Sequence, residues 1–172
     1  MSIGTSGLTG DLGPAQVTWG NVVLDTYDKV GFTLTGVTAE VFENVFGATP
    51  VDDVFLGYSA CLADVPATRI TITNLQQVLP GGSCSGTGTT KSVKLNADIS
   101  VGISHYDHGA NLLIQPIIDG VASTTKGIIL YKTYPVPNFD VSFDLTTERV
   151  YAFQFKAHPG SDGVFFRAGK VA

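Results

Sequence analysis

Short apolar segments separated by turn residues dominate the last third of the chain. Each is rich in Val, Ile, Phe and Tyr and is bounded by Gly, Pro, Asn or Asp, a pattern typical of consecutive antiparallel strands without crossover helices. Phe153 and Phe155 alternate with Gln154 and Lys156, so one face of the sheet is expected to be buried and the other wet. The pattern predicts a meander of five strands: LLIQPII, GIILYKTYPV, NFDVSFDL, RVYAFQFKAH and GVFFRAG.

The alternation of apolar residues changes phase near residue 36. Large apolar residues occupy every second place from Val30 to Leu34, but beyond Gly36 they occupy the other set of places, beginning with Val37. A slip of one residue at a glycine is typical of a β-bulge or kink. The pattern therefore predicts a long strand that passes from one packing environment into another and extends beyond its own domain.

The segment that follows carries more apolar surface than a solvated hairpin tip normally does. Between Glu43 and Asp53 and just before them, the apolar residues are Phe42, Val45, Phe46, Pro50 and Val51. From the residues alone, this loop either folds back on its own core or meets a neighbouring molecule.

Two further elements are expected in the first half. Residues 16–24 predict a strand, and its core-facing side chains would be Val17, Trp19 and Val22. The pattern predicts a helix over about 67–79, with Pro66 well placed at its start. The sequence TRITIT at 68–73, however, alternates as a strand does. Residues 81–111 predict a Gly- and Ser-rich loop followed by one or two strands, and Asp119–Gly120 predicts a tight turn.

Composition places the chain among folded, mainly β proteins. Its 172 residues are 44% hydrophobic and 15% charged, which fits one domain with a proper core, and 20 glycines and eight prolines favour turns and strands over long helices. Residues 1–13 are small, polar and Gly-rich, so we expect a flexible arm that a partner orders. We expect residues 14–172 to form a single β-domain with a protruding loop at about 43–53.

The charge balance argues against two kinds of partner. A net charge of −5 with scattered Lys and Arg disfavours a protein that grips nucleic acid through phosphates. No apolar run approaches the ~20 residues needed to cross a bilayer, so no membrane partner is expected. The first residues lack a basic region and an apolar stretch, so no export signal is expected and the protein would be made in the cytosol.

The residues that could carry chemistry form no convincing site. Two imidazoles and a carboxylate in His105–His108 could share a metal ion, but a polar turn between strands explains them better. The sequence GGSCSGTGTTK lacks the Gly-Lys-Ser/Thr ending of a phosphate-binding loop, and no nucleophile elbow or pair of catalytic carboxylates stands out. We therefore expect no enzyme activity, no metal and no cofactor.

The two cysteines have no metal-ligand spacing. Cys61 lies in an apolar stretch and reads as a buried small hydrophobe, whereas Cys84 lies in a polar loop. A disulfide between them, or between neighbouring subunits, is a hypothesis, since disulfides persist only in oxidising surroundings.

The order of several motifs over residues 13–169 resembles tailed-bacteriophage tail tube proteins. These motifs are Gly13-Pro14, Trp19-Gly20-Asn21, GATPVDDVFLG at 47–57, Leu112-Leu113 before Pro116, a Tyr-Pro-Val strand end, Glu148-Arg149, a Phe-Lys-Ala ending and Phe-Arg-Ala-Gly. The resemblance implies an antiparallel β-sandwich or barrel with one flanking helix. It also implies hexameric rings with a continuous inner β-barrel, which stack into a hollow tube through contacts at Phe42, Val45, Phe46, Pro50 and Val51.

The same resemblance implies a location and partners. The tube would belong to a virion tail assembled in the host cytoplasm and would conduct DNA without binding it specifically. Tail sheath, tape measure, baseplate and terminator proteins would be its other partners. A type VI secretion-like or tailocin inner tube protein remains an alternative, and an unrelated monomeric β-sandwich binding domain remains another.

Overall fold

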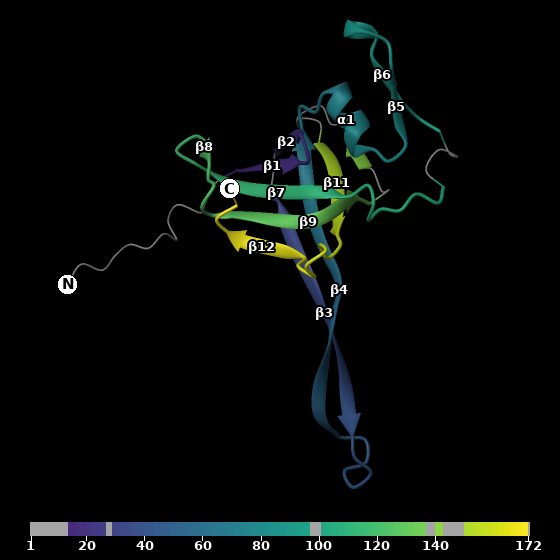
Figure 1. The fold of residues 1–172 in the computed structure, drawn as a ribbon, viewed down its shortest axis with the longest axis vertical. Helices are drawn as coiled ribbons and strands as arrows, with labels where there is room; N and C mark the ends of the chain where they lie inside the picture. Colours follow the sequence, from purple (N-terminus) through teal and green to yellow (C-terminus); the bar gives the residue numbers. More distant parts are fainter. Residues whose placement is uncertain (1–13, 27–28, 97–100, 137–139, 143–149, 172) are drawn as a thin grey trace, which may run out of the picture.

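The protein forms a β-barrel with a long projecting hairpin and one helix (Figure 1). The structure, a computed structural model, describes residues 14–26, 29–96, 101–136, 140–142 and 150–171, so the expected arm at 1–13 lies outside the described residues. The elements are β1 (Ala15–Trp19), β2 (Val22–Thr26), β3 (Gly31–Phe42), β4 (Pro50–Thr68), α1 (Ile72–Val78), β5 (Gly82–Ser85), the 3-10 turn η1 (Gly88–Thr90), β6 (Ser92–Leu95), β7 (Ala110–Ile118), β8 (Val121–Ala122), β9 (Gly127–Pro135), β10 (Asp140–Ser142), β11 (Val150–Ala157) and β12 (Phe166–Gly169).

Six antiparallel strands close on themselves to make the barrel. They run in the order β11–β4–β2–β1–β7–β9, and β9 returns to β11 where Pro135 lies opposite Phe155 and Thr133 opposite Ala157. Closure satisfies the edges that an open sheet would expose. The largest fully buried side chains of these strands fill the core: Val17, Leu24, Val65, Leu112, Leu130, Thr133 and Phe155. The expected mainly β barrel with one helix is confirmed.

Trp19 ties the first strand to β9 and β11. Its indole Nε1 donates a hydrogen bond of 3.1 Å to the backbone oxygen of Thr133. Its ring centroid lies 5.8 Å from that of Phe155 and 6.4 Å, edge to face, from that of Tyr134. A large apolar ring with a satisfied N–H stabilises the barrel where β9 and β11 meet.

The first predicted strand is two strands in the structure. Residues 16–24 contain a turn at Gly20–Asn21 that separates β1 from β2. Gly20 has a φ of 56°, which suits the first central position of a type II′ hairpin turn. The expectation that Val17 and Val22 face the core holds, because both are buried.

The predicted helix over 67–79 begins too early. Residues up to Thr68 belong to β4, and α1 starts at Ile72 after Thr71, whose side chain accepts a hydrogen bond of 3.1 Å from the backbone N–H of Asn74. Pro66 pairs with Ala152 of β11 instead of opening the helix. On its other side β4 is changing neighbour from β3 to β2, so a residue without an N–H is tolerated there.

Four of the predicted meander strands correspond to β7, β9, β11 and β12, and residues 140–142 of the remaining one form β10. Residues 138–139 and 143–145 of that strand lie outside the described residues. The predicted neighbours are only partly correct. β7 pairs with β9 and β10 with β11, as expected of consecutive strands. β12 pairs with β9, however, and β4 from the first half lies beside β11. The tight turn is confirmed, because Asp119 and Gly120 have φ values of 51° and 79° and join β7 to β8.

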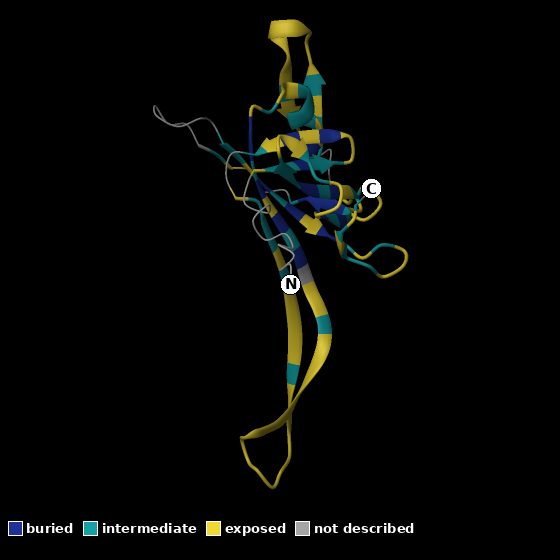
Figure 2. Ribbon diagram, turned by 90° about the vertical axis from the view of Figure 1, so that its left-hand side faces the viewer, coloured by how far each residue is buried: buried dark blue, intermediate teal, exposed yellow. Residues whose placement is uncertain are grey.

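Two extensions leave the barrel in opposite directions (Figures 1 and 2). The distal part of the β3–β4 hairpin, residues 36–59, projects downward as a two-stranded ribbon. From here on we call this ribbon the arm, and it is distinct from the N-terminal arm expected at residues 1–13. Residues 71–96, with α1, η1 and the β5–β6 hairpin, form a smaller projection that we call the lobe. Figure 2 shows the arm mostly exposed and the buried residues gathered in the barrel.

We expect the barrel and the arm to differ sharply in their contribution to stability. Phe155→Ala should lower the free energy of unfolding by about 3–5 kcal/mol, because this side chain is fully buried. Phe46→Ala, the same change on the exposed arm, should stay within about 0.5 kcal/mol. Urea unfolding of the isolated chain at dilutions where it is monomeric measures both values, and equal losses would contradict this location of the core.

Candidate assembly surface

The arm begins at a β-bulge at the place where the phase slip predicted one, but the extra residue, Ser59, lies in β4 and not in β3. The register between β3 and β4 shifts between Thr35 and Gly36, and shifts again between Val37 and Thr38. At Gly36 the Phe55 ring crosses the strand so closely that an added Cβ would lie 3.2 Å from it. Phe55 also packs edge to face on Tyr58, with centroids 5.1 Å apart. The bulge therefore separates a strand with one buried face from a ribbon with none.

The arm presents apolar side chains on both faces. Residues directly opposite in an antiparallel pair point to the same face, so Phe55 shares a face with Thr38, and Val54 shares the other with Ala39. Phe55 remains 55% exposed and Val54 45% exposed. A ribbon of two strands with this much exposed apolar surface lacks the packing that normally stabilises a hairpin. The surface is therefore suited to contact another molecule.

The structure places all five predicted contact residues on the distal half of the arm. Val45 is 86% exposed, and backbone hydrogen bonds from Phe46 to Glu43 and from Thr49 to Phe46 shape the tip. The others are also exposed: Phe42, Phe46, Pro50 and Val51. The loop does not fold back on its own core, so these side chains stay exposed in the single chain. Their contact with another molecule stays a prediction.

Sequence reasoning missed the apolar residues of the returning strand. Leu56 is 64% exposed, although it belongs to the same apolar stretch of sequence as the buried Cys61. The signal that could have found them is the slip at Gly36, because any residue paired beyond a bulge shares its new environment. The missed residues are Val54, Phe55, Leu56 and Tyr58.

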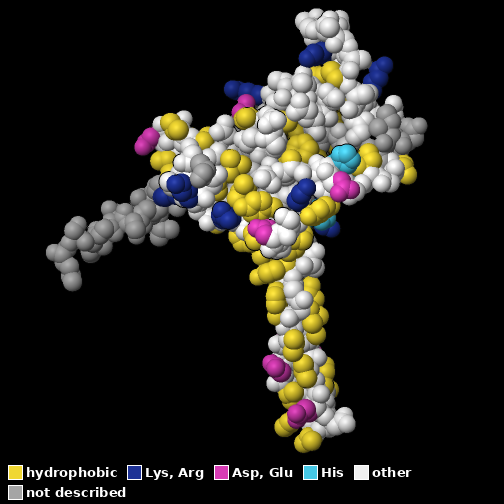
Figure 3. Space-filling view, in the orientation of Figure 1, with side chains coloured by type: hydrophobic (Ala, Val, Ile, Leu, Met, Phe, Trp, Pro, Cys, Tyr) yellow, Lys and Arg dark blue, Asp and Glu magenta, His cyan; other side chains and the backbone are white. Residues whose placement is uncertain are grey.

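Charge on the arm is of one sign. Glu40 lies directly opposite Asp53, and Val41 lies opposite Asp52. No Lys or Arg occurs in the sequence from 30 to 68. Figure 3 shows acidic and apolar side chains along the arm, with Lys and Arg confined to the body of the molecule on that face. Like charges directly opposite one another in a ribbon repel, so the isolated arm is electrostatically unfavourable.

The histidine-rich segment forms a polar turn packed on aromatic rings. His105 stacks on Tyr134 with centroids 4.4 Å apart, and Tyr106 meets His158 edge to face. Lys132 Nζ lies 5.0 Å above the Tyr106 ring. In the part of the chain that the structure describes, no three His, Cys, Asp or Glu side chains are placed to hold a metal ion.

Burial and neighbouring positive groups perturb two side chains of this cluster. Desolvation, together with Lys156 and His105, lowers the pKa of His158. Burial raises the pKa of the Tyr134 hydroxyl. The lowered pKa favours the neutral imidazole of His158 near pH 7.

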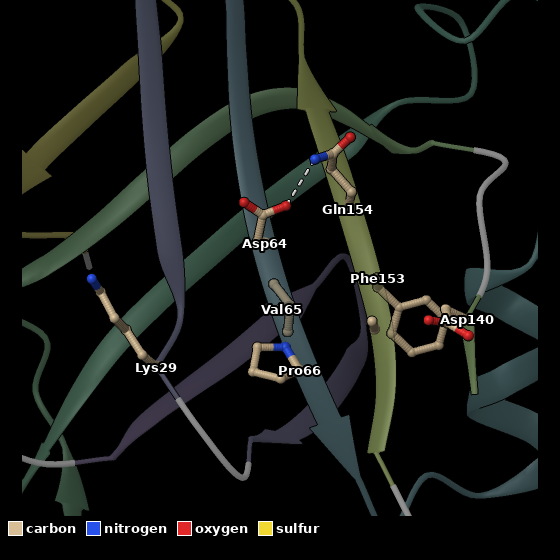
Figure 4. A pocket seen from close by; sticks show the side chains of 8 residues that line it. Lys29, Asp64, Val65, Pro66, Asp140, Phe153 and Gln154 are labelled. Carbon is tan, nitrogen blue, oxygen red and sulfur yellow. Dashed lines mark hydrogen bonds between the residues drawn. The ribbon is translucent and has the colours of Figure 1, made fainter. Parts of the chain in front are cut away.

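A hollow of about 460 Å³ lies where β4, β10 and β11 meet (Figure 4). Gln154 Nε2 donates a hydrogen bond of 2.8 Å to Asp64 Oδ1, and Figure 4 shows the two side chains pointing toward one another across the strands. The Phe153 ring and Pro66 line its apolar part. The hydrogen bond between the Asp64 carboxylate and the Gln154 amide links β4 to β11.

Both cysteines are free thiols in the structure, so the hypothesised bond between them is not formed within the chain. Cys61 is fully buried in β4, and its burial raises the pKa of its thiol. Cys84 is half-buried in β5 of the separate β5–β6 sheet. A disulfide between subunits stays a prediction. Among the described residues, no helix combines the length and apolar character needed to span a membrane.

Solved structures resemble this fold, although no protein-family model and no curated protein matches the sequence. A chain of the sheath–tube complex of an extracellular contractile injection system, PVC, in the extended state aligns with a TM-score of 0.56 at 12% identity over 91% of this chain and 90% of that one. Hcp1 from Flavobacterium johnsoniae aligns with a TM-score of 0.43 at 13% identity over 84% of this chain and 89% of that one. A chain of the anti-feeding prophage baseplate aligns with a TM-score of 0.36 at 11% identity over 91% of each chain. The first likeness shows a shared fold, in agreement with the tail tube-like barrel expected from the sequence.

The lowered pKa of His158 predicts a stability that depends on pH. The unfolded state binds the proton more readily than the folded state, so stability is greatest above the ordinary value of 6.5 and falls as the pH drops from there toward the lowered folded pKa. The positive or titratable groups around His158 are Lys156, His105, Lys132 and Tyr106.

Thermal unfolding between about pH 8 and 5 measures this dependence, and His158→Gln should flatten it. His108→Gln is the matched control and should leave the slope in place. An unchanged slope in His158→Gln would show that another group controls the acid sensitivity.

Proposed function

We propose that this chain is the subunit of a hollow protein tube, in which hexameric rings stack on one another. The observation that carries the proposal is the arm, a projecting ribbon with apolar side chains on both faces that its own barrel does not cover. A soluble protein gains little from such a surface unless another copy buries it. The shared fold with a chain of a sheath–tube complex supports the same function.

Ring formation would use the strand edges that remain open in one molecule. Within the described residues, β3, β10 and β12 each pair with a single neighbouring strand. Backbone N–H and C=O groups on such an edge are a template for pairing with another chain. Pairing between subunits would complete the hydrogen bonds and extend the sheet around the ring, so that assembly also protects the edges from aggregation.

The tube that best suits the sequence is that of a phage tail, through which DNA passes into the host. Each copy contributes a formal charge of −5, so a wall built from this protein would hold DNA weakly. Tail sheath, tape measure, baseplate and terminator proteins would be its partners within the virion. The role is structural, with no catalytic step. The inner tube of a tailocin or a type VI-like secretion machine is the alternative, and a monomeric binding domain is the remaining one.

Deleting residues 44–52 should separate folding from assembly. The deletion joins Glu43 to Asp53, which already lies opposite Glu40, so a three-residue connection closes the shortened ribbon. We expect the variant to fold, because the barrel is untouched, and to form no tubes. Negative-stain electron microscopy with size-exclusion chromatography compares it with the intact protein.

The intact protein should give rings or hollow tubes with six-fold end views. Circular dichroism and the thermal midpoint serve as the folding control for the deletion variant. Tubes made by the deletion variant would show that the arm is not needed for stacking. A stable intact monomer at high concentration, without rings or tubes, would instead favour the binding-domain alternative.

Assembled tubes should retain DNA poorly. The wall would be acidic, and screening of its charge over about 8 Å limits the reach of its repulsion at physiological salt. When double-stranded DNA is mixed with tubes and the tubes are sedimented, the DNA should therefore remain in the supernatant. Bovine serum albumin, which is also acidic, controls for trapping in the pellet. Strong retention at moderate salt would contradict the proposed conduit.

A further inference from the structure

Acidic and basic residues occupy separate consecutive blocks of this chain. From residue 30 to 64 the charged residues are all carboxylates: Glu40, Glu43, Asp52, Asp53 and Asp64. From residue 65 to 96 they are all basic: Arg69, Lys91 and Lys94. The first block contains the arm and the second contains the lobe. Charge is therefore divided between the two parts of the molecule that leave the barrel.

The two parts lie at opposite ends of the molecule. Figure 1, drawn with the longest axis vertical, places the arm tip at one end and the β5–β6 hairpin of the lobe at the other, and Figure 2 agrees after a turn of 90°. Figure 3 shows basic side chains beside the lobe and acidic ones near the arm tip. One end of a copy is thus complementary in charge to the opposite end of the next.

The surfaces also match in apolar character. On the arm, Val45 and Phe46 are 86% and 57% exposed. On the lobe, Leu95 is 56% exposed and directly follows Lys94 in β6. Lys91 Nζ is held by a hydrogen bond of 2.9 Å to Thr73 Oγ1 of α1, which orders one positive group at this surface before any partner arrives.

We propose that the arm of one copy docks on the lobe of a second copy in the adjacent ring, with the arm carboxylates beside Lys91 and Lys94. The inference rests on the proposed tube and names the surface that receives the arm. The docked lysines relieve the repulsion between Glu40 and Asp53, which face each other in the isolated ribbon. Because the two surfaces differ and lie at opposite ends, the contact is head-to-tail and repeats without closing, which produces a linear stack.

A charge-swap experiment on the full chain tests this docking. The arm variant is Asp52→Lys/Asp53→Lys, the lobe variant is Lys91→Glu/Lys94→Glu, and a third chain carries all four changes. Lys126→Glu/Lys170→Glu is the matched control, because it alters the net charge by as much as the lobe variant at two exposed residues outside the lobe. Circular dichroism checks folding, and electron microscopy counts rings and tubes over a series of protein concentrations.

We expect the arm variant and the lobe variant each to make rings that do not stack, or to need at least ~10-fold more protein to form tubes. The four-change chain should recover stacking, and the control should stack as the intact protein does. Intact tubes should also shorten as salt rises above physiological ionic strength, since the Debye length falls from about 8 Å at 0.15 M to about 3 Å at 1 M.

Four results would overturn the docking. Normal stacking of the arm or lobe variant would show that these charges do not meet. Failure of the four-change chain to recover, or loss of stacking in the control, would show that local structure or net charge is responsible. If the intact protein makes neither rings nor tubes, the proposed function itself fails and the docking with it, whereas intact tubes with unaffected variants overturn the docking alone.

Discussion

One continuous strand, β4, constrains the whole molecule. Its C-terminal part is a barrel strand that pairs with β11 and β2, and its N-terminal part pairs only with β3 to make the arm. Because an unbroken run of 19 residues from Pro50 to Thr68 carries both, the direction of the arm is tied to the packing of the core. Cys61, Ala63, Val65 and Ala67 bury alternate side chains in this strand. The core thus orients a surface that it does not itself cover.

The bulge at Gly36 lets one hairpin serve two environments. On the barrel side of the bulge, Phe32 and Leu34 pack against the core, whereas on the arm side both faces of the ribbon meet solvent. Unpaired strand edges and exposed apolar side chains would be hazards in a permanent monomer. In the assembly that we propose they would form the contacts between subunits, and the separation of acidic and basic blocks would give those contacts a direction along the stack.

Residue types that elsewhere carry chemistry serve packing in this protein. His105 and His158 contact Tyr134 and Tyr106, and Trp19 fills the junction of β9 and β11. Burial raises the pKa of the Cys61 thiol, so this thiol is a weaker nucleophile than an exposed one. Packing of these rings fixes the turn at 105–108 against β9, which carries Lys132 and Tyr134.

The sequence by itself determined what depends on local pattern. Alternation at Tyr151, Phe153 and Phe155 showed which face of β11 is buried, the slip at Gly36 placed the bulge, and Asp119–Gly120 placed a turn, because side-chain period and backbone φ are local properties. Only the tertiary structure decided which strands are neighbours and which apolar residues stay exposed. β12 pairs with β9, although β10 and β11 lie between them in the sequence. β4 continues to Thr68, beyond residue 67 where the helix was expected to begin, and the apolar side chains at 54–58 remain exposed. Each depends on contacts between residues far apart in the chain, which hydrophobic period does not encode.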